Sequence, residues 1–497
     1  MPTVLPFRAV RPSPDDEPIA ERLSPPYDVI APAERARLAR APHNPVHLIL
    51  PEDEGEKGSR YAVAGRTLAA WLKDGTLARD EAPAFYAYEQ SFTHHGRPLT
   101  RRGFFGLLEL VPFSEGGVFA HERTLAAPRE DRFRILEATR ANLSPVFVLY
   151  EDPDGKIALA LETARARAPL ARATTPEGEE ALWALPDRPE DSPEARCLAA
   201  GVANVTHALA AQGLVFADGH HRYESALRYR NERRAAEPDA PAPQAYDYML
   251  ACFVDAGDPG LLVLPTHRGV RGLLPITMAQ LAERLDPTFR IEGLGDCSDP
   301  ESVAWRAEAF LSAHPRGAFV AVTARERVLT GFVLDSTRRA EAFRGLDTPP
   351  VLQELDVVQL HELVLDRALG ITAEQITAQT HVEYVKSTLD AIRIVRGVGE
   401  GAGEGAGEGA GVVSGASAAS APNVAFLMNP TPVRQVLEVA RAGERMPQKS
   451  TYFLPKITTG WVYHVHGTPS EVWGEAAASR AWWPAVPAGT PGSSKRA

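Results

Sequence analysis

The sequence contains few cysteines and no long apolar run. Its three cysteines, at positions 197, 252 and 297, form no Cys-x-x-Cys pair, so neither a zinc ribbon nor a disulfide framework is expected. No apolar stretch approaches the roughly 20 residues that a membrane helix requires. Residues 1–11 also lack the apolar core of a signal peptide. We therefore expect reduced thiols, no membrane contact and a cytoplasmic location.

An excess of basic residues is also missing. The formal net charge is −11 at pH 7, whereas a protein that coats nucleic acid needs a basic surface. Nucleic acid is therefore not an expected partner, although a small basic pocket remains compatible with this charge. The composition, 44% hydrophobic and 24% charged, is that of a globular protein. The length predicts about two to four domains or subdomains, and the sequence does not indicate the oligomeric state.

The N-terminal third has the pattern of a mixed α/β region. Apolar spacing predicts a helix over residues 61–72, and aromatic alternation predicts a strand over residues 85–92. His95-Gly96 fits a hairpin turn after that strand, and residues 146–150 have the apolar pattern of a buried strand. Residues 23–30 contain two prolines, which predict a loop.

Helix and strand patterns continue through the rest of the chain. Apolar spacing predicts helices over residues 303–313 and 355–369, and strands over residues 319–322 and 328–334. After these, residues 423–428 have the pattern of a strand. Asn429-Pro430-Thr431 is then expected to cap a helix that contains Val433, Val436, Leu437 and Val439.

These patterns divide the chain into five regions. We expect an N-terminal α/β region with the phosphate-loop core over residues 1–275 and an α+β subdomain over 276–396. Residues 397–421 consist mainly of Gly-Ala-Gly-Glu repeats and small residues, which cannot bury enough apolar surface to offset backbone entropy. We expect them to form a flexible insertion. A C-terminal βαβ segment over 422–474 completes the fold, and residues 475–497 are expected to be a disordered tail.

The strongest local feature is the segment Asp218-Gly219-His220-His221-Arg222. It follows a predicted strand over residues 213–217 and precedes a predicted helix with Tyr223, Ala226 and Leu227 on one face. A strand that ends in glycine and opens a helix presents free backbone N–H groups at one point. Those donors and the helix dipole favour an anion. The segment therefore predicts a phosphate-binding loop, most simply for a nucleotide.

Each side chain of this loop has an expected role. Gly219 permits close approach of a ligand to the backbone, and Arg222 can hold phosphate oxygens in a bidentate fork. His220 and His221 add hydrogen-bond donors. Asp218, at the carboxyl end of the strand, could ligate magnesium or accept a hydroxyl proton. The alternative is a capped helix whose Asp218 and Arg222 pair on the surface.

Several segments resemble motifs of one large prokaryotic family, the domain of unknown function number 1015. The likeness spans nearly the whole chain and keeps the order of the motifs, but it implies no established activity. The insertion at 397–421 departs from the family pattern. The matching segments are Leu23–Ile30, His121-Glu122-Arg123-Thr124, Ala217–Tyr223, Leu264–Arg268 and Pro447–Phe453.

A second, local resemblance concerns the loop at 218–222. It is similar to the phosphate loop of the ParB/sulfiredoxin superfamily, which includes CTP-binding ParB proteins, sulfiredoxins and free-serine kinases. The resemblance implies phosphate contact for Gly219, His220, His221 and Arg222. It also implies an α/β (α+β) fold with mixed sheets and a ParB/sulfiredoxin-like nucleotide-binding core. Members of the first family tend to lie beside serine-biosynthesis genes, which implies a serine or phosphoserine substrate.

Two further segments could present acidic groups. His121 and Glu122 pair an imidazole with a carboxylate, which suits a general base or metal ligand and equally suits a surface salt-bridge cluster. Tyr27 and Asp28 follow the rigid Pro25-Pro26 pair, an arrangement that could place an acid in a cleft. An ordinary Asx-type turn explains the same residues.

Two other segments could add positive charge to the same pocket. His267-Arg268 follows a short apolar strand, and a solvated loop is the alternative. Lys449-Ser450-Thr451, with Lys456 close behind, could reach a phosphate, but this stretch lacks the glycine-rich approach of a P-loop.

The leading hypothesis is a nucleotide-dependent phosphotransferase that acts on a small hydroxyl metabolite, with free serine as one candidate. The loop at 218–222 and magnesium would hold the phosphates of a nucleoside di- or triphosphate. Asp28, Glu122 or Asp218 would take the hydroxyl proton. One alternative is a phosphate-ester hydrolase of the phosphoserine type that uses water as nucleophile. The other is a nucleotide-binding regulatory protein without catalysis.

Overall fold

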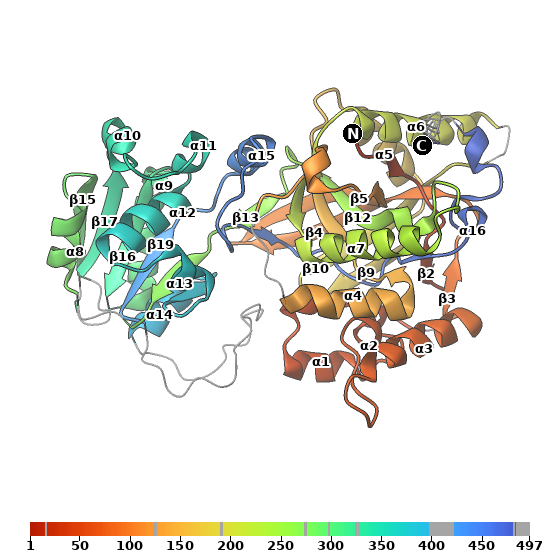
Figure 1. The fold of residues 1–497 in the computed structure, drawn as a ribbon, viewed down its shortest axis with the longest axis horizontal. Coiled ribbons are helices and arrows are strands. Elements are labelled where there is room, and N and C mark those ends of the chain that lie inside the picture. Colours follow the sequence, from red (N-terminus) through yellow and green to blue (C-terminus); the bar gives the residue numbers. More distant parts are fainter. Residues whose placement is uncertain are drawn as a thin grey trace, which may run out of the picture.

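The chain forms two lobes, each built around a β-sheet, in a computed structural model (Figure 1). The expected α/β class with mixed sheets is confirmed. None of the helices in the described part of the chain is both long and apolar enough to cross a membrane. The insertion expected over 397–421 lies outside the described residues. The structure describes residues 1–14, 17–122, 127–188, 192–272, 276–296, 299–323, 326, 328–396, 422–480 and 483.

The first lobe contains a nine-stranded mixed sheet. Its strand order is β6-β11-β8-β12-β5-β4-β10-β9, with β1 paired to β5. The β12–β8 and β11–β6 pairs are parallel, and the other pairs are antiparallel. The strands are β1 (Val4–Leu5), β4 (Ala84–His94), β5 (Arg97–Glu109), β6 (Val118–Phe119), β8 (Val146–Tyr150), β9 (Ala171–Thr175), β10 (Gly178–Pro186), β11 (Leu214–Asp218) and β12 (Tyr248–Asp255).

Helices cover this sheet on two sides. In Figure 1, α5 (Lys156–Arg165) and α6 (Pro193–Ala210) lie above it, while α4 (Ala127–Thr139) and α7 (His220–Ala236) lie below it. The helix expected over 61–72 is confirmed as α3 (Arg60–Lys73). Its buried residues Ala64, Leu68 and Trp71 recur at helical spacing, which gives α3 one apolar face.

The second lobe contains a six-stranded antiparallel sheet in the order β15-β17-β16-β19-β14-β18. Two helices, α9 (Pro300–Ala313) and α14 (Thr388–Arg396), share a separate apolar core with this sheet. The strands are β14 (His267–Val270), β15 (Phe289–Asp296), β16 (Ala318–Thr323), β17 (Val328–Leu334), β18 (Val382–Val385) and β19 (Val424–Met428).

The C-terminal segment connects the two lobes. Its first strand, β19, lies inside the second sheet, and its second strand, β20 (Tyr452–Leu454), pairs with β13 (Leu262–Leu264) between the lobes (Figure 1). Its third strand, β21 (His464–Val465), pairs with β7 (Ala141–Asn142) of the first lobe. The chain first enters the second sheet at β14, a few residues before the expected boundary at 275.

Two helices differ from their predictions. Residues 355–369 form α12 (Asp356–Gln359), which continues as a π-helix over Leu360–Ala368. The helix after β19 is α15 (Val433–Arg441), but its N-cap is Pro432 and no side chain caps it. The prediction that Asn429-Pro430-Thr431 caps this helix is therefore wrong, because the Thr431 hydroxyl donates to the Ser450 carbonyl instead.

The start of the expected tail contains regular structure. Ala477–Ser479 form a 3-10 turn after α16 (Pro469–Trp473), and the ring of Trp483 contacts that of Trp473. Residues 481, 482 and 484–497 of the tail lie outside the described residues.

Candidate functional site

The predicted strand–turn–helix at residue 218 is present. Strand β11 is buried from Leu214 to Ala217 and ends at Asp218, and α7 begins at His220. Gly219 between them has φ +93°, and a Cβ there would lie 2.8 Å from Cγ1 of Val146. Only glycine meets both conditions. The pairing of β11 with β8 shifts register between Phe216 and Asp218, and such an irregularity often redirects a side chain beside a site.

The first turn of α7 presents backbone donors. The Tyr223 N–H donates to the Gly219 carbonyl at 3.0 Å, and this is the hydrogen bond that joins α7 to the turn. The backbone amides before Tyr223 belong to the first turn of the helix, whose N–H groups the regular helical pattern does not pair. Because the helix has 17 residues, its dipole also favours negative charge at this end.

Asp218 forms an ion pair with a distant lysine. Lys456 Nζ donates to Asp218 Oδ2 at 2.6 Å, and Arg222 Nη2 lies 3.8 Å from Asp218 Oδ1. Burial opposes ionisation of Asp218, but the charges of Lys456 and then Arg222 hold its pKa well below the ordinary value. Arg222 Nη1 also donates to the Pro145 carbonyl. One nitrogen of the Arg222 guanidinium, which was predicted to bind phosphate, therefore bonds to the protein backbone.

Further cations converge on this pair. Lys386, which follows β18 of the second lobe, places Nζ 3.8 Å from the centroid of the Tyr452 ring. Lys456 Nζ lies 4.4 Å from the same ring. Burial, and then the charges of Lys456 and Lys449, lower the pKa of Lys386 to about 8. We call Arg222, Lys386, Lys449 and Lys456 the cationic cluster.

Asp28 lies beside the cationic cluster and is exposed. Burial lowers the pKa of Lys456, but the charges of Asp218 and then Asp28 leave it raised. Among the described residues, Asp28 has no hydrogen-bond or ion-pair partner. Its neighbour Tyr27 holds the short 3-10 turn Tyr27–Val29 in place, because the Arg132 guanidinium stacks 4.0 Å from the centre of its ring.

Glu122 holds a loop of the C-terminal segment. Its Oε1 accepts hydrogen bonds from the amides of Ser450 and Thr451, at 3.1 and 2.9 Å, and from the Thr451 hydroxyl at 2.9 Å. Burial opposes its ionisation, but the hydrogen bond from His121 and the charge of that residue lower the pKa of Glu122 to about 2. Such a carboxylate is a weak base. Arg123 and Thr124, the rest of this motif, lie outside the described residues.

Two histidine rings face one another next to the loop. The centroids of His121 and His220 lie 5.0 Å apart, and His121 Nε2 lies 2.9 Å from the Thr451 hydroxyl. Within the described residues, His121 Nδ1 and His220 Nε2 are buried and have no hydrogen-bond partner. Burial, and then His121, lower the pKa of His220 to about 3, so this ring is neutral. His221, the next residue, is half-buried.

The second predicted cationic segment has a different environment. His267 is buried in β14, where Nδ1 accepts from the Met428 amide at 3.1 Å and Nε2 lies 3.2 Å from the Thr388 hydroxyl. Both ring nitrogens thus have partners inside the second lobe. Arg268 is also buried, and it donates to the Thr266 carbonyl and, at 3.2 Å, to the Lys449 carbonyl. Its contribution is to hold the loop that carries Lys449.

A buried carboxylate that sequence reasoning missed supports the Lys456 segment. Glu180 accepts hydrogen bonds from Tyr88, Gln90, Thr458 and Trp461 at 2.6–3.0 Å. The Gln90 amide also donates to the Lys456 carbonyl at 3.0 Å. The network therefore fixes the backbone on both sides of Ile457. Nothing in the local sequence distinguishes Glu180 from its neighbour Glu179.

A metal site of protein ligands is not evident in the part of the chain that the structure describes, since no three His, Cys, Asp or Glu side chains there could hold an ion. Magnesium that arrives with phosphates needs only one or two carboxylates. Asp218, the predicted ligand, fits this role poorly, because one oxygen accepts from Lys456 and the other lies near Arg222.

Comparison with known proteins agrees with the family predicted from the motifs. The model of a family described as "Protein of unknown function (DUF1015)" matches residues 4–358. This range includes four of the five motif segments, and Pro447–Phe453 lies beyond it. No curated protein matches the chain.

Solved structures resemble the chain only weakly. A conserved hypothetical protein from Pyrococcus furiosus is 12% identical, with a TM-score of 0.28 over 69% of this chain and 92% of that one. A free serine kinase in complex with AMP is 12% identical, with a TM-score of 0.29 over 69% and 89%. SbnI with a C-terminal truncation, from Staphylococcus aureus, is 11% identical, with a TM-score of 0.28 over 72% and 86%. Scores this low assign no activity.

Proposed function

Because this chain belongs to DUF1015, a family of proteins of unknown function, we propose its activity from its own residues: transfer of the terminal phosphoryl group of a nucleotide to the hydroxyl of a small metabolite. The observation that carries this proposal is the cationic cluster at the N-terminus of α7, centred on the 2.6 Å pair of Lys456 and Asp218. Four cations meet there against the two carboxylates Asp218 and Asp28.

Excess positive charge favours a phosphate ligand at this point. Burial and the neighbouring lysines lower the pKa of Lys386 to about 8. A bound anion would therefore stabilise the charged form of Lys386. The α7 amides add hydrogen-bond donors. One buried ring nitrogen each of His121 and His220 has no partner within the described part of the chain. A bound ligand would satisfy both, since buried polar atoms rarely remain without a partner.

Asp28 is the best of the three predicted acids for proton transfer. Asp218 is neutralised by Lys456. Burial raises the pKa of Glu122, but the hydrogen bond and charge of His121 and the hydrogen bond of Thr451 lower it to about 2. Asp28 is exposed, close to the cationic cluster and unpaired among the described residues. It can therefore accept a proton and release it to water.

The proposed step is an in-line displacement. The acceptor hydroxyl oxygen forms a bond to the terminal phosphorus of a nucleoside di- or triphosphate, and the bond from that phosphorus to the bridging oxygen breaks. The hydroxyl proton passes to Asp28, and the nucleotide leaves one phosphate shorter. This loose transition state needs positioning and cationic stabilisation, which Lys456, Lys386 and the α7 amides would supply. Asp218 would orient Lys456.

We assign no protein ligand to magnesium. Nucleotides carry magnesium on their phosphates, and in this proposal the ion enters with them and neutralises part of their charge. The acceptor to test first is free serine, the compound implied by the tendency of family members to lie beside serine-biosynthesis genes.

Phosphorus NMR tests this proposal. Purified protein would be mixed with magnesium and ATP, ADP, CTP or GTP, with and without L-serine, and separately with O-phosphoserine. Nucleotide consumption that requires serine and yields one phosphoserine per nucleotide supports a phosphotransferase. Hydrolysis of phosphoserine alone indicates the ester hydrolase, and binding without turnover indicates the regulator. Either result would overturn the proposal.

An acidic variant identifies the proton acceptor in the same assay. Asp28→Asn should lower turnover by about 10²–10⁴-fold, the usual contribution of a general base, while nucleotide affinity is kept. Asp154→Asn is the matched control, because Asp154 is also exposed but pairs with Lys156 at 2.8 Å. Equal activity of both variants would remove Asp28 from the step.

A further inference from the structure

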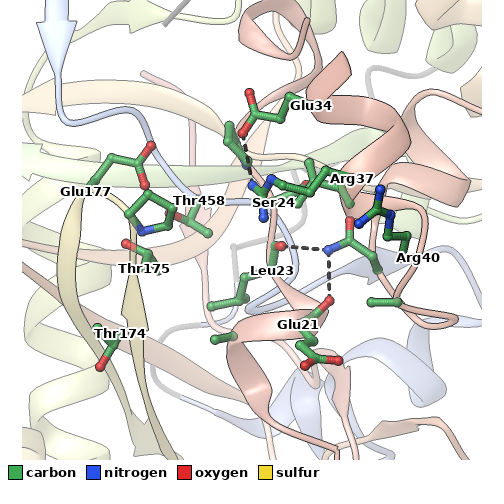
Figure 2. A pocket seen from close by; sticks show the side chains of 16 residues that line it. Glu21, Leu23, Ser24, Glu34, Arg37, Arg40, Thr174, Thr175, Glu177 and Thr458 are labelled. Carbon is green, nitrogen blue, oxygen red and sulfur yellow. Dashed lines mark hydrogen bonds and ion pairs between the residues drawn. The ribbon is translucent and has the colours of Figure 1, made fainter. Parts of the chain in front are cut away.

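A cavity of about 420 Å³ is lined in part by Thr458, two residues after Lys456 of the cationic cluster. Figure 2 shows one wall formed by the turn between β9 and β10 and the other by the segment around α1 (Pro32–Leu38). Ser24 and Thr458 line it between these walls. Ser24 is 2% exposed, and within the described residues its hydroxyl has no hydrogen-bond partner. A buried hydroxyl without a partner is a position that a polar ligand would satisfy.

Charged side chains of both signs line the cavity: Glu177 is on one wall, and Arg37 and Arg40 are on the other together with Glu21 and Glu34. Glu177, at the β9–β10 turn, lies across the cavity from Arg37 and Arg40 (Figure 2). Burial and the charges of Glu180 and Glu34 raise the pKa of Glu177, although a hydrogen bond from Thr175 opposes the rise. Glu177 forms no ion pair with any described residue. On the other wall, Arg37 lies 3.4 Å from Glu34. Arg40 is exposed and forms no ion pair with any described residue.

A short segment of chain connects the cavity to the proposed phosphate site. Thr458 lines the cavity and lies two residues after Lys456, and two extended residues span at most about 7 Å. A second connection runs through residues 24–28: Ser24 and Pro25 line the cavity, and Asp28 follows three residues after Pro25. Ser24 and Thr459 exchange backbone hydrogen bonds of 3.0 and 2.9 Å, which fix these two strips of chain to each other.

We propose that this cavity binds the phosphoryl acceptor and that the acceptor is a small zwitterion, with its ammonium group at Glu177 and its carboxylate at Arg40. That the ligand is the phosphoryl acceptor rests on the proposed function. That it is a zwitterion rests on the cavity alone. The opposite charges of Glu177 and Arg40 select a ligand that carries both charges, since a ligand with one charge leaves the other side chain without a partner. The Ser24 hydroxyl, unpartnered among the described residues, suits a polar ligand.

Three small probes separate the two charges. L-serine carries both groups, ethanolamine lacks the carboxylate, and glycerate lacks the ammonium. Calorimetric titrations of the full-length protein with each probe, with and without ADP, should give the tightest binding for L-serine. Glu177→Gln should weaken L-serine and ethanolamine at least tenfold and leave glycerate unchanged. Arg40→Gln should weaken L-serine and glycerate and leave ethanolamine unchanged.

Glu179→Gln is the matched control, because Glu179 lies on the same hairpin, is exposed and does not line the cavity. It should bind all three probes as the wild type does, and all three variants should keep wild-type affinity for ADP. Failure of L-serine to bind in both titrations, or unchanged affinity in Glu177→Gln and Arg40→Gln, would overturn the proposal.

The proposed function can fail separately. Serine-dependent nucleotide consumption that both cavity variants retain would uphold the phosphotransferase and reject this cavity. Conversely, serine binding that depends on Glu177 and Arg40, without any nucleotide turnover, would uphold the cavity and reject the phosphotransferase.

Discussion

Lys456 Nζ lies 2.6 Å from Asp218 Oδ2, although 238 positions separate the two residues in the sequence. Asp218 ends a strand of the first sheet, whereas Lys456 belongs to the segment that returns from the second lobe. The pair therefore forms only when the C-terminal segment has docked. It links the completed fold to the cationic cluster, and the predictions below follow from it.

The pair should contribute to stability as a partly buried ion pair. Removal of one partner costs about 0.2–1 kcal/mol for exposed pairs and about 3–5 kcal/mol for buried ones. With side chains 16% and 23% exposed, Asp218→Asn should lower the free energy of unfolding by about 2 kcal/mol in urea titrations. Asp218→Asn combined with Lys456→Met should recover part of this loss. Wild-type stability of the single variant would show that the pair contributes nothing.

Nucleotide affinity should fall as the pH rises above about 8. The pKa of Lys386 is lowered to about 8 by burial and by Lys456 and Lys449, so below that pH the ammonium is charged before and after binding. An anion raises this pKa, so above pH 8 binding requires uptake of a proton, and affinity falls by up to about tenfold per unit.

Titrations of ADP between pH 7.5 and 9.5 test this dependence. Lys386→Arg keeps its charge across the range, so its affinity should remain nearly constant. A wild-type profile as flat as that of Lys386→Arg would show that Lys386 does not contact the anion.

Gly219→Ala should disrupt the start of α7. Alanine at φ +93° costs about 1–2 kcal/mol, and its Cβ would also approach Val146 Cγ1 to 2.8 Å. Gly58→Ala is the control, because Gly58 has φ +89° but nothing lies within 4 Å of its added Cβ. Thermal unfolding and ADP titration should show a larger loss for Gly219→Ala in both measurements. Equal losses in the two variants would mean that the contact with Val146 is relieved easily.

Glu180→Gln should weaken nucleotide binding although Glu180 lies outside the cationic cluster. The carboxylate accepts hydrogen bonds from four side chains. In the amide of the variant, the NH₂ group would face some of these donors and could not accept from them. We expect a loss of about 3 kcal/mol in unfolding free energy and weaker binding of ADP, because Thr458 and Gln90 no longer fix the Lys456 backbone. Glu179→Gln, exposed on the same strand, should change neither quantity. The same behaviour from both variants would refute a positioning role.

Local patterns were sufficient to predict the loop at 218–222. A run of buried apolar residues ends at Asp218, and glycine followed by polar residues starts a helix. All of these signals lie within one short stretch of chain. The hairpin around His95-Gly96 and the helix α3 were predictable for the same reason.

The partners of the loop depend on tertiary structure, which local patterns do not contain. Lys386 is a single lysine after a short strand, and only the pairing order of the second sheet brings it to Tyr452. His267 looked equivalent to Arg268 in the sequence, but successive residues of a strand point to opposite faces. The role of Glu122 as a loop anchor likewise depends on a contact more than 300 residues away.

The most direct test of the cationic cluster as a phosphate site is calorimetric titration of ADP into the wild type, Lys456→Met, and the double variant Asp218→Asn/Lys456→Met. The double variant removes both charges of the pair, so it separates loss of the lysine from exposure of an unpaired aspartate. Circular dichroism would establish that each variant is folded. We predict that both variants bind ADP at least tenfold more weakly than the wild type, about 1.4 kcal/mol or more. Wild-type affinity in a folded double variant would contradict a phosphate site at Lys456.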